Sequence, residues 1–284
     1  MKKLKFTLGR TNLSKMYITF IRPVLEYASV VWDGCNMFDM ERLEKVQLSA
    51  ARIVTGLPIL ASTESLYTET GWESLVSRRN KAKLITMFKI HTNQVPEYLS
   101  NIIPPVTKNV SKYHTRNSEN YSVPISRLEL YKKSFVPDTI RKWNSLKLEV
   151  REATSLNIFK KNITESIPQP PKYFSFGKRT INILHTKLRH NCILNYDLYR
   201  RNIIESPNCI CGQKEDVYHF FFVCKNYVNA RNNLFELLFN RLDETILINS
   251  HLLLWGSDNL SYNTNCFIFS AVQKFINESG RFNN

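Results

Sequence analysis

The chain has 284 residues and a formal net charge of +15, from 39 Lys and Arg against 24 Asp and Glu. Hydrophobic residues make up 43% and aromatic residues 12%, which is typical of a globular protein and excludes an intrinsically disordered one. The positive excess favours a polyanionic partner, either nucleic acid or an anionic membrane surface. No stretch approaches the roughly 20 apolar residues that a membrane-spanning helix needs.

The N-terminus and the cysteines indicate the compartment. "MKKLKFTLGR" begins with charged residues but no apolar h-region follows, so a secretory signal peptide is not expected. Six cysteines are too few for a disulfide scaffold, and three of them lie in one cluster, which is typical of metal binding in a reducing compartment. We therefore expect a nuclear or cytoplasmic protein that is not secreted and has no membrane partner.

Residues 11–100 have the pattern of amphipathic helices. In "MERLEKVQLSAARIVTGL" apolar residues recur at helical spacing, and Gly56 stands where a helix would end. "LSKMYITFIRPVLEYASVVW" is as densely apolar, and Pro23 is expected to kink it. "WESLVSRRNKAKLITMFKIH" predicts a third helix, with several Lys and Arg along one flank.

The composition of the middle of the chain predicts a boundary between two domains. A polar, irregular loop is expected over residues 104–125, followed by helices in "LYKKSFVPDTIRKWNSL" and "TSLNIFKKNI". "IPQPPKYFSFGKRT", residues 167–180, contains three prolines and a glycine, which favours a linker. We predict a mainly α protein: a helical domain over residues 1–166, this linker, and a smaller helical domain over residues 181–284 that contains a zinc-knuckle-like motif.

That motif consists of Cys209, Cys211, His219 and Cys224, in the pattern Cys-x-Cys-x7-His-x4-Cys. Zn²⁺ prefers four tetrahedral nitrogen or sulfur ligands, and three thiolates with one imidazole form a closed, structural shell. Gly212 permits the tight turn that lets two nearby cysteines face one ion. His219 and Cys224 would point about 140° apart on an unbroken helix, so the chain must bend between them. The pattern predicts structural zinc, and the alternative is three half-buried cysteines and a histidine beside an aromatic helix.

The densest positive run lies directly before this motif. Residues 172–202 carry seven Lys or Arg against one acidic residue, whereas residues 203–284 carry six against eight. Cationic side chains neutralise phosphates, and exposed aromatic rings stack on unpaired bases at roughly 1–3 kcal/mol each. We predict nucleic-acid contacts by Lys172, Lys178, Arg179, Lys187, Arg189, Tyr196, Tyr199, Arg200 and Arg201, with Tyr173, Phe174 and Phe176 interleaved among them. The alternative is that Tyr196, Leu198 and Tyr199 pack as core and the charges only solvate a surface.

Several of these stretches together resemble a known family. "MYITFIRPVLEYASVVWDGCN", "LEKVQLSAARIVTGL", "GWESLVSRRNKAKLITMFKI", "VPEYL" and "SFVPDTIRKWNSL" are similar, in this order, to the region downstream of the polymerase core in non-LTR retrotransposon reverse transcriptases of the jockey-like kind. "KLRHNCILNYDLYRRNIIESPNCICGQKEDVYHFFFVCKNYVNAR" resembles the C-terminal segment of those proteins, which ends in a Cys-Cys-His-Cys motif. The resemblance covers roughly residues 10 to 240.

The resemblance implies a C-terminal fragment that binds nucleic acid without catalysis. In the family, the matched parts are implied to hold template RNA and target DNA, and the polymerase and endonuclease lie N-terminal to them. The polymerase of the family has an Asp-Asp pair on a turn, and here "LNYDLY" offers only Asp197. Some members also have a second type of nuclease after the Cys-Cys-His-Cys motif, and for its acidic residues "WGSDNL" offers only Asp258. We therefore expect no enzyme activity, although the full-length parent would be an RNA-directed DNA polymerase. The alternatives are a domesticated zinc-stabilised scaffold for a protein partner and an unselected retroelement-derived product.

Overall fold

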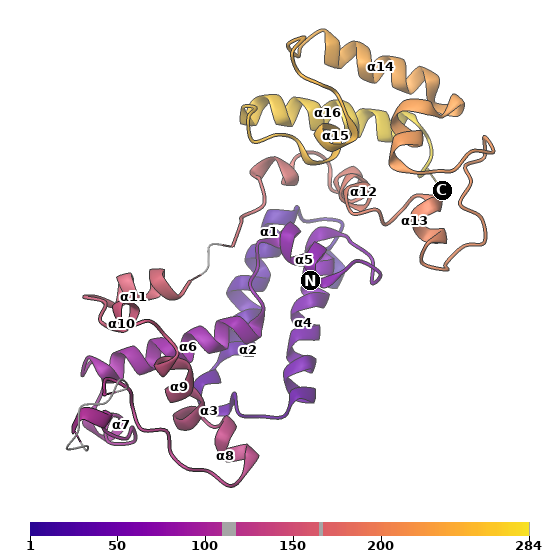
Figure 1. Ribbon diagram of the computed structural model, residues 1–284. Helices are drawn as coiled ribbons and strands as arrows, with labels where there is room; N and C mark the ends of the chain where they lie inside the picture. The colour runs from indigo at the N-terminus through magenta and orange to yellow at the C-terminus, as the bar shows by residue number, and fades with distance from the viewer. Residues whose placement is uncertain (110–117, 165–166, 284) are drawn as a thin grey trace. The chain divides into compact units, whose positions relative to one another are not determined.

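The structure, a computed structural model, describes residues 1–109, 118–164 and 167–283, and these residues form helices joined by turns and loops (Figure 1). Over the same ranges no β-strand is formed, although isolated antiparallel bridges join Val106 to Tyr121 and Asn208 to Lys214. The predicted mainly α fold is confirmed. None of the helices in the described ranges is both long enough and apolar enough to cross a bilayer.

The helices are short to medium in length and follow one another closely. The α-helices are α1 (Arg10–Met16), α2 (Arg22–Glu26), α3 (Ser29–Trp32), α4 (Met37–Thr55), α5 (Thr63–Thr70), α6 (Leu75–His91), α7 (Glu97–Ser100), α8 (Glu129–Lys133), α9 (Phe135–Asn144), α10 (Leu148–Arg151), α11 (Leu156–Ile163), α12 (Arg179–Arg189), α13 (Asn195–Tyr199), α14 (Val228–Phe239), α15 (Ser250–Trp255) and α16 (Tyr262–Glu278). Turns of 3-10 helix occupy Lys2–Leu4, Thr107–Asn109, Lys172–Ser175 and Lys225–Tyr227, and wider π-helical turns occupy Tyr17–Ile21 and His219–Val223.

The chain folds into two compact units, each assembled from separate stretches of sequence. The first unit comprises Met1–Thr19, Leu48–Gly71 and the residues from Pro168 onward. The second unit comprises Phe20–Gln47 and Trp72–Ile167. The Cys/His motif and the basic segment, residues 172–202, therefore both lie in the first unit.

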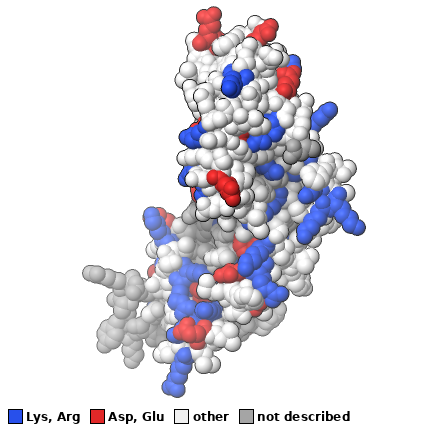
Figure 2. All heavy atoms as spheres, turned by 90° about the vertical axis from the view of Figure 1, so that its right-hand side faces the viewer, with Lys and Arg blue, Asp and Glu red and all other residues white. Residues whose placement is uncertain are grey.

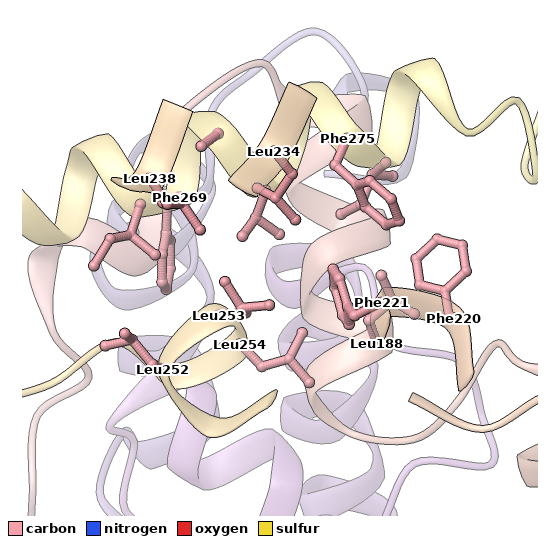
Figure 3. Packing of buried hydrophobic residues seen from close by; sticks show 14 of the residues in the cluster. Leu188, Phe220, Phe221, Leu234, Leu238, Leu252, Leu253, Leu254, Phe269 and Phe275 are labelled. Atoms are coloured by element: carbon pink, nitrogen blue, oxygen red, sulfur yellow. The ribbon is translucent and has the colours of Figure 1, made fainter. Parts of the chain in front are cut away.

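The core of the first unit is formed where α12, α14, α15 and α16 pack together (Figure 3). Leu188 of α12, Leu234 of α14, Leu253 of α15, and Phe269 and Phe275 of α16 are each at most 1% exposed. Burying a side chain of this size stabilises a fold by roughly 1.5–3 kcal/mol relative to exposure. This core holds α12, the helix of the basic segment, in place.

Gly56 shows how the sequence ends a helix and allows close packing at one position. It follows the last residue of α4 with a φ of +79°, and its N–H donates to the Arg52 carbonyl over 2.8 Å. A Cβ at this position would lie 2.5 Å from Cγ1 of Ile183 in α12, so a larger residue would push the two segments apart. The predicted helix end at Gly56 is confirmed.

The second unit has its own apolar core around α6 and α9. The rings of Phe88, Trp143 and Phe159 lie with centroids 4.4–6.5 Å apart. Arg79 and Lys83 of α6, two of the cations on its predicted flank, are buried and each lies 2.6 Å from a carboxylate oxygen of Asp33. Because a buried charge is tolerated only when it is paired, these residues serve the interior of the unit.

Candidate metal centre and basic segment

The first two cysteines of the motif lie on a tight turn. Asn208 and Lys214 form an antiparallel bridge, and within it the N–H of Cys209 donates to the Gln213 carbonyl over 2.8 Å. The Gly212 N–H donates back to the Cys209 carbonyl over 2.8 Å, and Gly212 has a φ of +90°, a conformation that glycine adopts at no steric cost. The turn brings the two cysteine side chains to the same side of the loop.

The other two residues of the motif lie on a π-helical turn. Asp216 caps its start, since its Oδ1 accepts from the N–H of His219 over 2.8 Å. The N–H of Cys224 donates to the His219 carbonyl over 2.8 Å, an i→i+5 bond that closes a wider turn than that of an α-helix. Cys224 then leaves the helix, with φ −56° and ψ 123°. This is the bend that the spacing of His219 and Cys224 required.

The four side chains converge on one point. One ligand atom from each of Cys209, Cys211, His219 and Cys224 lies within 4.8 Å of the others. The Sγ atoms of Cys209 and Cys224 are 3.6 Å apart, and the Sγ of Cys211 is 3.2 Å from Nε2 of His219. A tetrahedral zinc ion with Zn–S bonds of about 2.3 Å separates its sulfur ligands by about 3.8 Å. The residues therefore fit a four-coordinate metal ion with the ligand set of structural zinc.

The thiols of the cluster differ in acidity. Burial, together with the neighbouring Cys209, raises the pKa of Cys224 to about 12. A hydrogen bond from the backbone of Gln213 lowers the pKa of Cys211, which is half-buried. A zinc ion binds thiolates, so its charge must displace the proton of Cys224 on binding. Without a metal the Cys224 thiol is thus protonated, and with one the four residues form a closed ligand shell.

A buried ion pair holds the metal-binding loop in place. Glu215 is fully buried and accepts from Nε of Arg281 over 2.6 Å and from Nη2 over 2.8 Å. Its Oε2 also accepts from the N–H of Asn195 at the start of α13 over 2.9 Å. Farther along, Arg231 of α14 donates to the carbonyls of Phe221 and Cys224. The sequence analysis missed these supporting residues because single charged residues distant in sequence carry no spacing signal.

The predicted nucleic-acid contacts differ in their exposure. Lys172, Lys178, Tyr199 and Arg200 are exposed, and Arg179, Lys187, Tyr196 and Arg201 are partly buried. Arg179 donates to the carbonyls of Lys5 and Ile53, over 3.1 and 2.7 Å. The ring of Tyr196 is covered by Lys214, whose Nζ lies 4.3 Å from the ring centroid.

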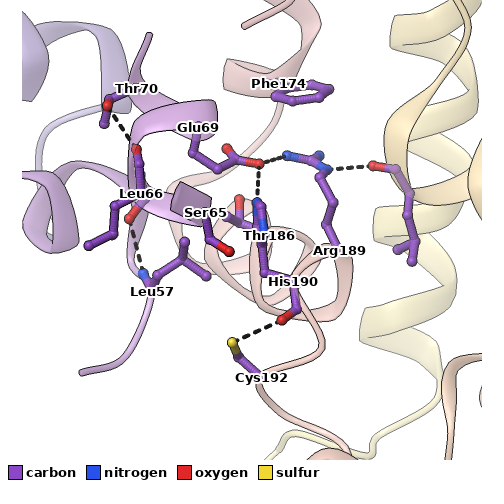
Figure 4. Close-up of polar contacts among 12 residues, drawn as sticks. Leu57, Ser65, Leu66, Glu69, Thr70, Phe174, Thr186, Arg189, His190 and Cys192 are labelled. Carbon is purple, nitrogen blue, oxygen red and sulfur yellow. Dashed lines mark hydrogen bonds and ion pairs between the residues drawn. The ribbon is translucent and has the colours of Figure 1, made fainter. Parts of the chain in front are cut away.

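Arg189 is not exposed to solvent (Figure 4). Its Nη1 lies 2.7 Å from Oε1 of Glu69, its Nε donates to the Leu254 carbonyl over 2.6 Å, and its Cζ lies 3.7 Å from the ring centroid of Phe174. Tyr173 and Phe174 are 6% and 4% exposed and belong to the core of the first unit. The expectation that these three residues face nucleic acid is corrected, because the core and Glu69 occupy their contact surfaces.

A small polar cavity lies at the end of the basic segment. It has a volume of about 220 Å³ and is lined by His190, Asn191, Asp197, Arg200 and Arg201. Burial raises the pKa of Asp197 to about 6, against the opposing effect of the two arginines. Arg200 and Arg201, two of the predicted nucleic-acid contacts, thus line the same cavity as His190.

Comparisons with protein-family models, with curated proteins and with solved structures found no match to this chain.

Proposed function

We propose that this chain binds nucleic acid without catalysing a reaction, and that a structural zinc ion at Cys209, Cys211, His219 and Cys224 folds the region beside its basic segment. The observation that carries the proposal is the exposure of Lys172, Lys178 and Arg200 in the same unit as the Cys/His cluster. Lys and Arg are also more widespread than Asp and Glu on the face drawn in Figure 2. Exposed cations of this kind bind phosphates and release condensed counterions.

The ligand set supports a structural role for the metal. Three thiolates and one imidazole fill the four positions that zinc prefers and leave none for a reacting water. The cluster is also largely buried, with Cys209, His219 and Cys224 among the buried residues. We assign the metal to folding, and the contacts with nucleic acid to the basic segment.

We further propose, from the resemblance described above, that the chain is the C-terminal part of a non-LTR retrotransposon reverse transcriptase. Its partners would then be template RNA and target DNA. The order of the matching stretches and the Cys-Cys-His-Cys motif support this origin.

Salt-dependent binding tests the proposal. A labelled single-stranded RNA and a nicked DNA duplex are titrated with the zinc-loaded chain, with and without chelator, as salt rises from about 50 to about 200 mM. We expect Kd to rise steeply with salt. Replacing Lys172, Lys178 and Arg200 together by alanine should reduce the slope of log Kd against log salt by about 2 to 3, since each phosphate contact contributes about 0.7 to 0.9.

A charge-matched control separates local contacts from net charge. Lys225, Arg241 and Lys274 are exposed residues of the same unit outside the basic segment, and their triple alanine variant loses the same formal charge. We expect it to bind nearly as the unchanged chain does. Absence of binding by the unchanged chain at low salt would refute the proposed function.

A protein-interaction scaffold is the second candidate, and one surface favours it. Phe20, Val24, Tyr27 and Val31, spaced by three or four residues along the second unit, are 71%, 74%, 79% and 81% exposed. The helix is interrupted at Tyr27 and Ala28, so these residues do not follow one helix face, but exposed apolar side chains at this density are typical of protein contact surfaces. Binding through this surface would change little with salt, whereas phosphate binding would weaken.

A further inference from the structure

A cavity of about 620 Å³ opens within the first unit. It is lined by the start of α1, by residues 170–172 and 174–177, and by Tyr262 at the start of α16. Binding sites for small organic groups have volumes of about 300–1,000 Å³. The described residues that line the cavity include two cations, Arg10 and Lys172, and no carboxylate. Its wall thus combines positive charge with aromatic rings.

The charge behind the wall is also positive. Arg10 is 6% exposed, and its Nη1 lies 2.5 Å from Oε2 of the fully buried Glu69. Glu69 is shared with Arg189, at 2.7 Å, and with His190, at 2.9 Å (Figure 4). Two guanidinium groups therefore share one carboxylate and leave a surplus of one positive charge. Because uncompensated buried charge is costly, an anion in the adjoining cavity would be stabilised there.

A third guanidinium adds to this surplus. Arg179 is partly buried, its Nη1 has no hydrogen-bond partner, and its other nitrogens donate to backbone carbonyls. Burial, together with the charge of Arg10, lowers the pKa of Arg179 to about 10, so the two cations are close enough to repel each other. An anion placed beside Arg10 would reduce this repulsion.

Aromatic rings form the other part of the wall. Tyr262 is 54% exposed, and Phe176 is half-buried. Phe174 lies against Arg189 on one side and is fixed in the core, with its ring centroid 6.1 Å from that of Phe269. Phe174 therefore supports the wall from the core, and the exposed Tyr262 and the half-buried Phe176 are the rings that suit a flat, apolar group.

The backbone of this wall is held before any ligand binds. Nδ2 of Asn182 donates to the carbonyls of Phe174 and Phe176, over 2.8 and 3.0 Å. Nε2 of Gln273 in α16 donates to the Phe176 carbonyl over 2.9 Å. Because the wall is already ordered, binding a ligand costs less conformational entropy.

We propose that this cavity binds one unpaired nucleotide of a single-stranded nucleic acid, with the base against Tyr262 and Phe176 and the phosphate beside Lys172 and Arg10. The inference rests on the proposed function and adds to it the form of nucleic acid. A nucleotide combines an anion with a flat aromatic ring, the two features for which the cavity has complementary groups. Bases in a duplex are stacked and paired, so the cavity favours a single strand over a duplex.

Binding of fluorescein-labelled oligo(U), oligo(dT) and an RNA duplex to the full zinc-loaded chain tests the proposal. Tyr262→Ala should raise Kd for the single strands by about 5- to 150-fold, the loss expected for one base–aromatic stack, and should leave duplex binding nearly unchanged. Tyr262→Phe, which keeps the ring, should restore single-strand binding. Phe239→Ala is the matched control, because Phe239 is 69% exposed in the same unit and lies outside the cavity.

Cross-linking of oligo(U) that carries 4-thiouridine provides a second, independent result. We expect the cross-linked peptides to contain residues 170–177 or Tyr262. Normal single-strand binding by Tyr262→Ala and Phe176→Ala, with cross-links elsewhere, would overturn the cavity assignment and leave the proposed function intact. Failure of the unchanged chain to bind any of the three nucleic acids would overturn both.

Discussion

Cys224 shows how one backbone conformation decides whether a residue can bind metal. It lies five residues after His219, a spacing that a regular α-helix would place on different faces. The i→i+5 hydrogen bond between these two residues widens the turn, and Phe220 and Phe221, both fully buried, anchor it in the core. The position of the fourth ligand thus depends on aromatic packing as well as on its own side chain.

We expect Cys224→Ser to abolish stoichiometric zinc binding, because a serine hydroxyl does not replace a thiolate in a buried sulfur-rich shell. Zinc content measured by atomic emission on protein purified without chelator checks this. Cys35→Ser is the control, since Cys35 lies in the other unit and outside the cluster, and it should keep its zinc. Equal zinc content in the two variants would contradict the assignment.

The buried His185 predicts a pH dependence of stability. Burial, together with the positive charge of Arg189, lowers its pKa to about 3. An unfolded chain binds this proton near pH 6.5, so between about pH 6.5 and about pH 3 the unfolded state binds more protons. The stability contributed by neutral His185 is complete above about pH 6.5 and is lost as the pH falls towards 3. We expect a loss of about 2 kcal/mol between pH 7 and pH 5 from this group.

Urea unfolding at several pH values measures this loss. His185→Gln keeps a donor for the Leu253 carbonyl, which His185 contacts at 3.0 Å, and removes the titrating ring. Its stability should depend less on pH than that of the unchanged chain. His251→Gln, at an exposed position of the same unit, should retain the full dependence. Equal slopes for the two variants would exclude His185 as the cause.

Single residues also mark the limit of what the sequence could predict. The convergence of Cys209, Cys211, His219 and Cys224 was predictable, because a zinc site requires these residue types at a short spacing. The burial of Arg189 was not, since its partner Glu69 lies 120 residues away and a charged residue at a helix end is usually solvated. The sequence contains both residues, but their contact arises only from the tertiary fold.

At the scale of elements, the metal-binding loop is connected to α13 and to the segment after α16. Glu215 contacts Asn195 at the start of α13 and Arg281 after α16. The three segments meet at one carboxylate, which is fully buried. A loop with little regular structure is therefore stabilised by an ion pair, apart from any metal that the Cys/His cluster binds.

We expect Arg281→Met to destabilise the first unit by about 3 kcal/mol, because it leaves the Glu215 carboxylate buried without its counter-charge. Chemical denaturation of the zinc-loaded protein measures the change. The double variant Glu215→Gln/Arg281→Met should recover part of the loss, since no unpaired charge remains. Arg241→Met, at an exposed arginine of the same unit, is the control, and a similar loss there would argue against the ion pair.

Helices with a regular apolar pattern were predictable from the sequence, but the elements against which they pack were not. The patterns around α4 and α6 predicted both helices, and Gly56 marked the end of the first. Pro23, expected to kink a long helix, lies just after the π-helical turn Tyr17–Ile21, which separates α1 from α2 within one helical run. Periodicity reports which face of a helix is apolar, but it does not identify the element that covers this face.

At the scale of the whole molecule, each unit has a separate apolar core, and only the first contains the Cys/His cluster. We expect a chelator to lower the thermal stability of the first unit, because structural zinc contributes about 10–16 kcal/mol of apparent folding free energy in small zinc domains. The second unit should keep its transition.

Circular dichroism and calorimetry with and without chelator measure the two transitions, and tryptophan fluorescence adds a local probe. Trp255 belongs to the first unit, and Trp143 is buried in the second. Addition of excess zinc should restore the first transition. Equal shifts of both transitions would contradict separate stabilisation by the metal.

The assembly of the first unit from distant stretches of chain has a consequence for the kinetics of folding. Three of its polar contacts join residues that are separated by 59, 120 and 174 positions in the sequence. In the second unit, the ion pairs of Arg79 with Asp33 and of Lys83 with Asp138 span 46 and 55 positions. Closing a longer loop costs more chain entropy before any contact forms, and folding slows as contacts become less local. The second unit should therefore reach its native state first, and the cysteines that bind the metal should stay accessible to thiol reagents for longer during refolding.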